Sequence, residues 1–134
     1  MNVLISIKPE FVEKIITQEK KYEFRKRIFT KNVENVIIYS TVPDKKIIGY
    51  FESNEVFKDH PKRLWESFSN KSGISKNDFF KYFKDKDEGY ALKIDNLNLF
   101  NNPINTDELN NFLAPQSFKY IDDEELENII KLSQ

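Results

Sequence analysis

The chain has 134 residues, of which 39% are hydrophobic and 14% aromatic, enough for a single domain over residues 1–134. It has no cysteine and one histidine, which excludes disulfides, thiolate metal sites and multi-histidine metal sites, so we expect no metal or cofactor. Apolar runs fall short of the roughly 18 residues that a membrane helix needs, and a signal-peptide pattern is missing, so we expect a cytoplasmic protein without membrane contact.

The net charge is −1, but the charges are unevenly distributed. Residues 1–31 hold eight basic and four acidic residues, whereas residues 122–134 hold five acidic residues and one basic residue. This asymmetry can mark one end that faces a polyanion. It can equally be a basic segment balanced by an acidic C-terminal helix.

The first third of the chain alternates between strand and helix patterns. Residues 3–8 alternate in polarity and predict a strand, and residues 9–17 have helical apolar spacing with Pro9 in the first turn. Residues 18–25 lead into a second strand, and residues 27–34 predict a loop pinned to the core by apolar side chains.

The middle of the chain predicts a hairpin followed by helices. Residues 36–40 form an apolar strand, and residues 46–57 predict a longer strand with Gly49 as a bulge or close approach. Asp59 or His60 can cap a helix that ends at Gly73, and a second helix follows from residue 75. A Ser-His-Asp triad could use only His60, but its place before a proline at a helix start favours capping.

The last third predicts strand, short helix, strand and helix. Residues 90–94 form a strand that can extend to residue 100, before Pro103 breaks it. Residues 106–112 predict a short helix, residues 118–121 a strand, and Asp122 caps a final amphipathic helix. Several strands around helical insertions predict a small mixed barrel of the α+β class. Three aromatic residues of the helical region could stack bases, although their spacing favours the core: Trp65, Phe79 and Phe80.

The stretch 18–25 concentrates the chemistry of this chain. Alternation places its two aromatic residues on one strand face and Glu23 and Arg25 on the other, with Lys20 and Lys21 at the strand entry. Such a set can hold a polar or anionic ligand, because arginine is a rigid fork of donors and lysine a mobile point charge. The alternative is a solvated strand face with a paired glutamate and arginine.

The order of these residues resembles the signature of the ASCH family, Gly-x-Lys-x-x-Glu-x-Arg. Lys20, Glu23 and Arg25 fall on its charged positions, and Gln18 stands where the family has glycine. Glycine there indicates a turn with positive φ, so Gln18 must either adopt that conformation or reshape the turn. Three further segments resemble the family, so that the resemblance spans most of the chain: Leu4–Pro9, Ile37–Thr41 and Ala114–Phe118.

The resemblance implies a PUA-like fold, a small mixed β-barrel with flanking and inserted helices. It also implies binding of RNA or a nucleotide in a cleft lined by the charged motif. On this basis we expect the following ligand-binding residues: Lys8, Lys20, Lys21, Glu23, Arg25, Tyr39, Ser40, Thr41, Gln116 and Ser117. The last two and the end of the strand at residues 39–41 would supply hydrogen-bonding groups for a base edge.

Two other functions remain open from the sequence. Some small ASCH proteins are amidohydrolases of N4-acetylcytidine, in which the motif lysine is catalytic and a threonine occupies the glutamate position; ribonuclease activity has also been linked to the family. Lys20 and Glu23 are therefore the catalytic candidates if the protein is a hydrolase, and the sequence leaves open whether it is an enzyme. The third function is a regulatory adaptor that uses the acidic last helix.

Overall fold

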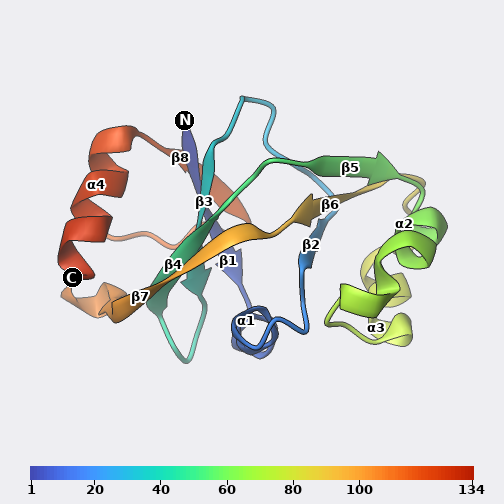
Figure 1. Cartoon of the computed structure of the whole chain (residues 1–134), viewed down its shortest axis with the longest axis horizontal. Coiled ribbons are helices and arrows are strands. Elements are labelled where there is room, and N and C mark those ends of the chain that lie inside the picture. The colour runs from blue at the N-terminus through green and yellow to red at the C-terminus, as the bar shows by residue number, and fades with distance from the viewer.

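Eight strands and four α-helices follow one another along the chain in this computed structural model, which describes residues 1–134 (Figure 1). Their bounds are β1 Asn2–Ile7, α1 Pro9–Ile16, β2 Tyr22–Arg25, β3 Asn35–Ser40, β4 Lys46–Glu52, β5 Val56–Asp59, α2 Pro61–Phe68, α3 Lys76–Tyr82, β6 Gly89–Lys93, β7 Asp95–Asn105, β8 Phe118–Ile121 and α4 Asp123–Leu132. No helix has the length and apolar character that crossing a membrane requires.

The strands pair into two sheets. The larger sheet has five strands in the order β7-β4-β3-β1-β8, and the smaller has three in the order β2-β6-β5. Only β1 and β3 are parallel; their connection carries α1 and β2. The α+β class expected from the sequence is confirmed. The strands nevertheless form two open sheets and no closed barrel, because β2 pairs with β6 and with no strand of the larger sheet.

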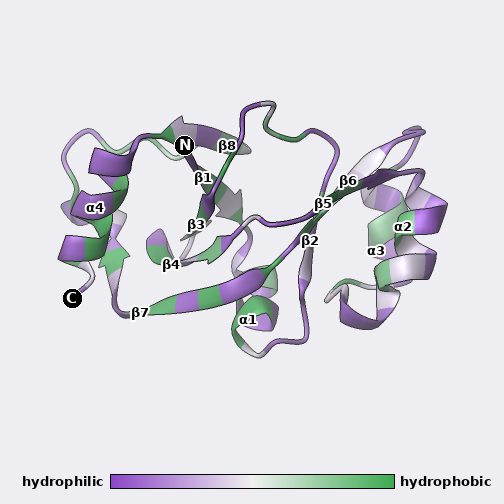
Figure 2. Ribbon diagram, turned by 45° about the horizontal axis from the view of Figure 1, so that its top comes forward, coloured by the Kyte–Doolittle hydropathy of each residue, from purple (hydrophilic) through white to green (hydrophobic).

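Three apolar clusters hold the parts together. The first lies between β1, β3 and α1, and the second lies on the other face of the larger sheet, beneath α4. Leu126 is buried there, with Ile129 and Ile130 beside it, so α4 shows hydrophobic and hydrophilic residues on different sides (Figure 2). The amphipathic spacing of this helix predicted that arrangement.

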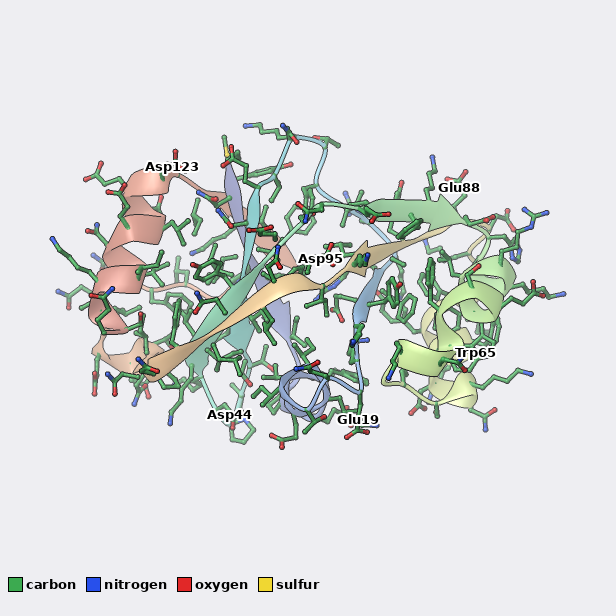
Figure 3. All side chains as sticks on the ribbon, in the orientation of Figure 1. Glu19, Asp44, Trp65, Glu88, Asp95 and Asp123 are labelled. Carbon is green, nitrogen blue, oxygen red and sulfur yellow. The ribbon has the colours of Figure 1, made fainter.

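The third cluster joins the smaller sheet to α2 and α3. Phe24 on β2 contacts Phe79 on α3 edge-on at 5.0 Å between ring centroids, with Leu64 of α2 buried alongside. The side chains of this cluster fill the space between α2, α3 and the smaller sheet. They lie at the end of the molecule opposite Asp123 on α4 (Figure 3). The molecule therefore consists of a larger sheet with α4 and a smaller sheet with a helical insertion, and β2 stands between them (Figure 1).

Several predicted caps are confirmed. Pro9 occupies the first turn of α1, and the His60 side chain accepts a hydrogen bond from the Lys62 amide at the start of α2. Asp122 accepts from the Glu125 amide at the start of α4. Each removes one unsatisfied donor from a helix end.

Two predicted strand boundaries are wrong. The strand expected over residues 46–57 is two strands in different sheets, because polar residues 53–55 interrupt it between β4 and β5. Pro103 does not break β7, which continues to Asn105. Residues 100–103 have no partner on β4, and β7 is an edge strand of the sheet. The absence of an N–H on Pro103 therefore removes no hydrogen bond between strands.

Two predicted helix boundaries are also wrong. Gly73 does not end α2, which stops at Phe68 and continues as a 3₁₀ turn over Ser69–Lys71. The helix expected over residues 106–112 is only a 3₁₀ turn over Thr106–Glu108, capped by the side chain of the preceding asparagine. Gly49 is a close approach, as expected, because a Cβ there would collide with the backbone carbonyl of a β7 residue.

The turn after α1 keeps the positive φ expected where the family has glycine, although Gln18 occupies that position. Gln18 has a φ of 67°, in the left-handed region, directly after Thr17 ends the helix. The Lys20 amide then donates to the Lys14 carbonyl at 3.0 Å, which turns the chain into β2. Glycine is the usual residue at this position of a helix end, since any Cβ is strained there.

We expect Gln18→Gly to stabilise the protein. Relief of left-handed strain exceeds the extra chain entropy of glycine, for a net gain of about 0.5–1 kcal/mol. The matched control is Thr17→Gly, which should destabilise because Thr17 has a φ of −78° and gains nothing from glycine. Urea unfolding of the three proteins gives the comparison, and an unchanged or lower stability of Gln18→Gly would refute the strain at this turn.

Candidate functional site

A cavity of about 340 Å³ lies where the two sheets and the helical insertion meet. One wall comes from the end of β1 and the start of α1, the second from β2, and the third from α3 and the loop before it. Residues far apart in the sequence thus share this space, including Ser6, Glu23, Tyr82 and Gln116.

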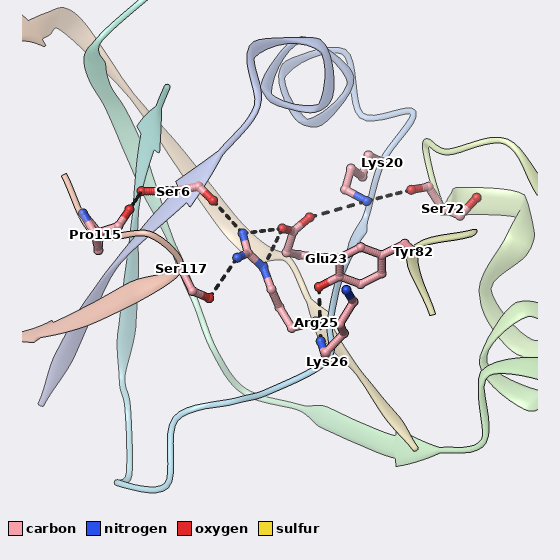
Figure 4. A network of polar contacts seen from close by, with 9 residues as sticks. All are labelled: Ser6, Lys20, Glu23, Arg25, Lys26, Ser72, Tyr82, Pro115 and Ser117. Atoms are coloured by element: carbon pink, nitrogen blue, oxygen red, sulfur yellow. Dashed lines mark hydrogen bonds and ion pairs between the residues drawn. The ribbon is translucent and has the colours of Figure 1, made fainter. Parts of the chain in front are cut away.

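A buried carboxylate, that of Glu23, is the centre of the polar wall (Figure 4). Its Oε2 accepts from Arg25 Nε at 3.0 Å and lies 2.8 Å from Arg25 Nη2, while its Oε1 lies 3.5 Å from Lys20 Nζ. Glu23 is only 6% exposed. The alternative of a solvated strand face is therefore wrong, because this face of β2 is covered by β1 and the insertion.

The guanidinium of Arg25 joins the smaller sheet to the larger one. Nη2 donates to the Ser6 carbonyl on β1 at 2.7 Å, and Nη1 donates to Ser117 Oγ, just before β8, at 3.2 Å. Ser6 Oγ also donates to the Pro115 carbonyl at 2.7 Å, which fixes the loop that carries Ser117. The side chain is 12% exposed, so Arg25 is largely held by the protein.

The amine of Lys20 ties the helical insertion to β2. It donates to the Ser72 carbonyl at 2.8 Å and lies over the rings of Phe11 and Phe24, 5.4 Å and 5.0 Å from their centroids. Gly73 makes this approach possible: its φ is +63°, and a Cβ there would collide with the Cβ of Lys20. Lys20 is 3% exposed, an uncommon burial for a lysine.

Burial lowers the pKa of Lys20 below its ordinary value, because the charged ammonium loses its hydration. Glu23 opposes this shift through its charge and hydrogen bond, and the cations of Arg25 and Lys14 add to it. Lys21 does not contribute, because its side chain is exposed outside the cavity.

The cavity brings together six of the ten residues expected from the sequence: Lys8, Lys20, Glu23, Arg25, Thr41 and Gln116. Ser117 lies behind them as a hydrogen-bond partner of Arg25. Lys8 and Gln116 are exposed and Thr41 is half-buried, so these three side chains form the rim. The three charged motif residues form the floor.

Three expected residues lie elsewhere. Lys21 lines a separate depression with Lys93 and Asp95, which Lys20 also borders from its other side. Tyr39 packs on Phe112 in the cluster under α4, on the face of β3 opposite the cavity. Ser40 is buried and donates to Asp44 at 2.8 Å, closing the turn after β3.

An apolar wall of the cavity was not expected from the sequence. It consists of Phe11 on α1, Ile74 before α3, and Phe79 and Tyr82 on α3. Helical spacing favoured the core over base stacking for Phe79, which lies in the core with no exposure and also borders the cavity. Tyr82 is 36% exposed on this wall, and only the docking of the insertion brings it beside Arg25.

No family model matches the sequence. The chain is 29% identical over 120 residues to the large ribosomal subunit protein uL22 of Ureaplasma parvum, covering 89% of this chain but only 39% of that protein's length. It is 28% identical over 135 residues to an ASCH domain-containing ribonuclease of Zymomonas mobilis, covering 97% of this chain and 90% of that protein.

Solved structures extend this similarity to the fold. The crystal structure of the Zymomonas mobilis ASCH protein matches with a TM-score of 0.91 at 28% identity, over 99% of this chain and 96% of that one. A single-residue variant of the same protein also has a TM-score of 0.91, over 99% of both chains. The chain is an ASCH domain protein. Its α+β architecture is that of the ASCH structures.

For this ASCH domain protein we expect Glu23→Gln to cost about 3 kcal/mol of stability. The change leaves two buried cations, Lys20 and Arg25, facing each other without the carboxylate that separates them. Glu55→Gln is the matched control, because Glu55 forms an exposed ion pair with Lys93 and its loss should leave the free energy of unfolding nearly unchanged. Chemical unfolding measures both; equal effects would contradict the central position of Glu23.

Proposed function

We propose that the protein binds RNA and holds one unpaired nucleotide in the cavity at β2. The observation that carries this proposal is the pairing of an aromatic wall with a floor of buried cations in one space of about 340 Å³. Single-stranded RNA is recognised by this combination, in which bases stack on aromatic rings and their edges or phosphates meet fixed donors.

The floor has hydrogen-bond donors left over for a ligand. Arginine has five N–H groups, and the contacts of Arg25 with Glu23, Ser6 and Ser117 use four of them. Lys20 likewise has one of its three N–H groups left after Ser72 and Glu23. Both carboxylate oxygens of the central glutamate are already engaged, so the floor favours the acceptor oxygens of a base or phosphate.

The rim adds groups that can read a base edge. The side chains of Thr41 and Gln116 make no hydrogen bond within the protein, and both face the cavity. Lys8 supplies an exposed cation beside them for a phosphate. Phe11 and Tyr82 offer ring surface at the entrance. Similarity to a relative named as a ribonuclease supports RNA as the ligand class.

We expect Arg25→Ala to weaken binding of a short single-stranded RNA by about ten- to a hundredfold, since an arginine contact to a phosphate or base edge contributes on the order of 1–3 kcal/mol. Because Arg25 also joins the two sheets, Lys8→Ala is the second variant, with an expected loss of about two- to fivefold. Lys131→Ala, an exposed lysine on α4 at the end of the molecule opposite the helical insertion, is the control. Fluorescence anisotropy at several salt concentrations measures all four proteins.

Unchanged affinity in folded Arg25→Ala, or equal losses in Lys8→Ala and the control, would count against this cavity. If phosphates dominate the contacts, affinity must fall steeply as salt rises. A complex that does not respond to salt would instead indicate recognition of the base alone.

A second candidate function is hydrolysis of RNA, and Lys20 is the observation that favours it. An amine with a lowered pKa has a larger neutral fraction at a given pH and can accept a proton from an attacking 2′-hydroxyl or water. Arg25 lies within the same cluster and can stabilise negative charge that develops on the phosphate. Binding remains the first function, because Glu23 favours the protonated amine.

If the protein cleaves RNA, we expect Lys20→Met to abolish cleavage while leaving the fold intact, since methionine fills the same buried space and leaves Glu23 paired with Arg25. The rate should rise with pH until the Lys20 amine is neutral. Hydrolysis of N4-acetylcytidine should be weak or absent, because the related amidohydrolases have an uncharged residue where this chain has Glu23. Gel analysis of RNA and release of cytidine provide the two measurements; cleavage that persists in Lys20→Met would exclude Lys20 as the base.

A further inference from the structure

A basic segment, residues 26–31, follows β2 directly and lies next to the cavity. It carries three exposed cations, Lys26, Arg27 and Lys31, and no acidic residue. None of the three forms an ion pair, although eight other ion pairs occur in the molecule. These cations are the largest part of the basic N-terminal region that the cavity does not use.

The backbone of the basic segment is held in place at its middle and at its far end. Ile28 and Phe29 pack against the core of the larger sheet, and Phe29 meets Phe118 of β8 edge-on at 5.8 Å. The hydroxyl of Tyr120 accepts hydrogen bonds from the amides of Thr30 and Lys31, at 2.9 Å and 3.2 Å. A fixed backbone presents its charges at set positions and reduces the ordering cost of binding.

The near end of the segment is continuous with the cavity wall. The Lys26 amide donates to the Tyr82 hydroxyl at 3.2 Å, and Lys26 Nζ lies 4.5 Å from the centre of the Tyr82 ring. Tyr82 itself lines the cavity, and Arg25 immediately precedes Lys26 (Figure 4). A strand leaving the cavity past Tyr82 therefore meets Lys26 first.

The same combination of cation and ring recurs farther along. Lys31 Nζ lies 4.9 Å from the centre of the Tyr120 ring, so each end of the basic segment pairs a lysine with a tyrosine. Grooves that bind single-stranded nucleic acid combine backbone-tracking cations with aromatic rings in this way. The positive stretch stops at Glu34, which pairs with the amino group of Met1.

We propose that the basic segment is a second RNA-contacting surface, which binds the phosphates next to the nucleotide held in the cavity. The proposal rests on the proposed RNA-binding function. An RNA strand fits this surface better than an acidic peptide does, because the cations continue from a cavity suited to a base and alternate with tyrosine rings. The cavity then sets which nucleotide binds, and the segment adds affinity that grows with strand length.

The test compares two probes, an eight-nucleotide oligouridylate carrying a fluorophore and uridine 5′-monophosphate. Replacing all three cations of the segment by alanine (Lys26→Ala, Arg27→Ala and Lys31→Ala) should weaken binding of the oligouridylate about tenfold or more. The slope of log affinity against log salt should fall by about 2, since each phosphate contact on a single strand contributes roughly 0.7. Affinity for the monophosphate, followed by NMR titration, should stay within about twofold.

The control is a second triple variant with the same charge change, Lys62→Ala, Lys76→Ala and Lys84→Ala. These lysines are exposed on the helical insertion and form no ion pair. Lys31→Ala alone, which lies farthest along the segment from the cavity, is the smaller change if the triple variant does not fold. It should lower the salt slope by about 0.7.

Equal losses in the two triple variants, or a loss for the monophosphate as large as for the oligouridylate, would overturn the second surface while leaving the cavity as an RNA site. If the wild-type protein binds neither probe, both the proposed function and this extension of it fail. A loss confined to the oligouridylate and to variants of the basic segment supports the proposal.

Discussion

A single buried carboxylate, that of Glu23, sets the geometry on which the site depends. On one side it faces Lys20, whose amine reaches the helical insertion through the Ser72 carbonyl, and on the other it holds Arg25, which reaches β1 and Ser117. Two buried cations repel each other and lose hydration, and the carboxylate between them offsets both costs. The two sheets and the insertion are thus joined through one charged cluster on one short strand.

This arrangement places the cavity where the two sheets and the helical insertion meet. It gives the cavity an aromatic side and a cationic side. Phe11 and Tyr82 contribute ring surface, while Lys20 and Arg25 contribute donors held at fixed positions by the rest of the cluster. Preorganised donors need little rearrangement to accept a ligand, which favours binding of an acceptor-rich group such as a nucleotide. The same cluster limits catalysis, because Glu23 stabilises the protonated form of the lysine that would act as base.

The sequence predicted the local features of this site. It did not predict the features that depend on how distant parts of the chain pack together. Alternation of period two assigned both faces of β2. Gln18 in place of glycine left either a positive φ or a reshaped turn, and the structure shows the positive φ. The contact of Lys20 with Ser72 joins residues 52 positions apart, and no local pattern encodes it. Tyr39 was misplaced because its neighbours along β3 do not reveal that its face packs under α4.

The most direct measurement is an NMR titration of the Arg25 Nε–Hε resonance with a short single-stranded RNA. We expect this resonance to shift together with the amides of Ser6, Thr41 and Gln116, which surround the same space. It should do so at RNA concentrations that leave the amides of α4 unchanged. Shifts confined to other surfaces, with the Arg25 side chain and the cavity amides unmoved at saturation, would contradict RNA binding at the Glu23 cluster.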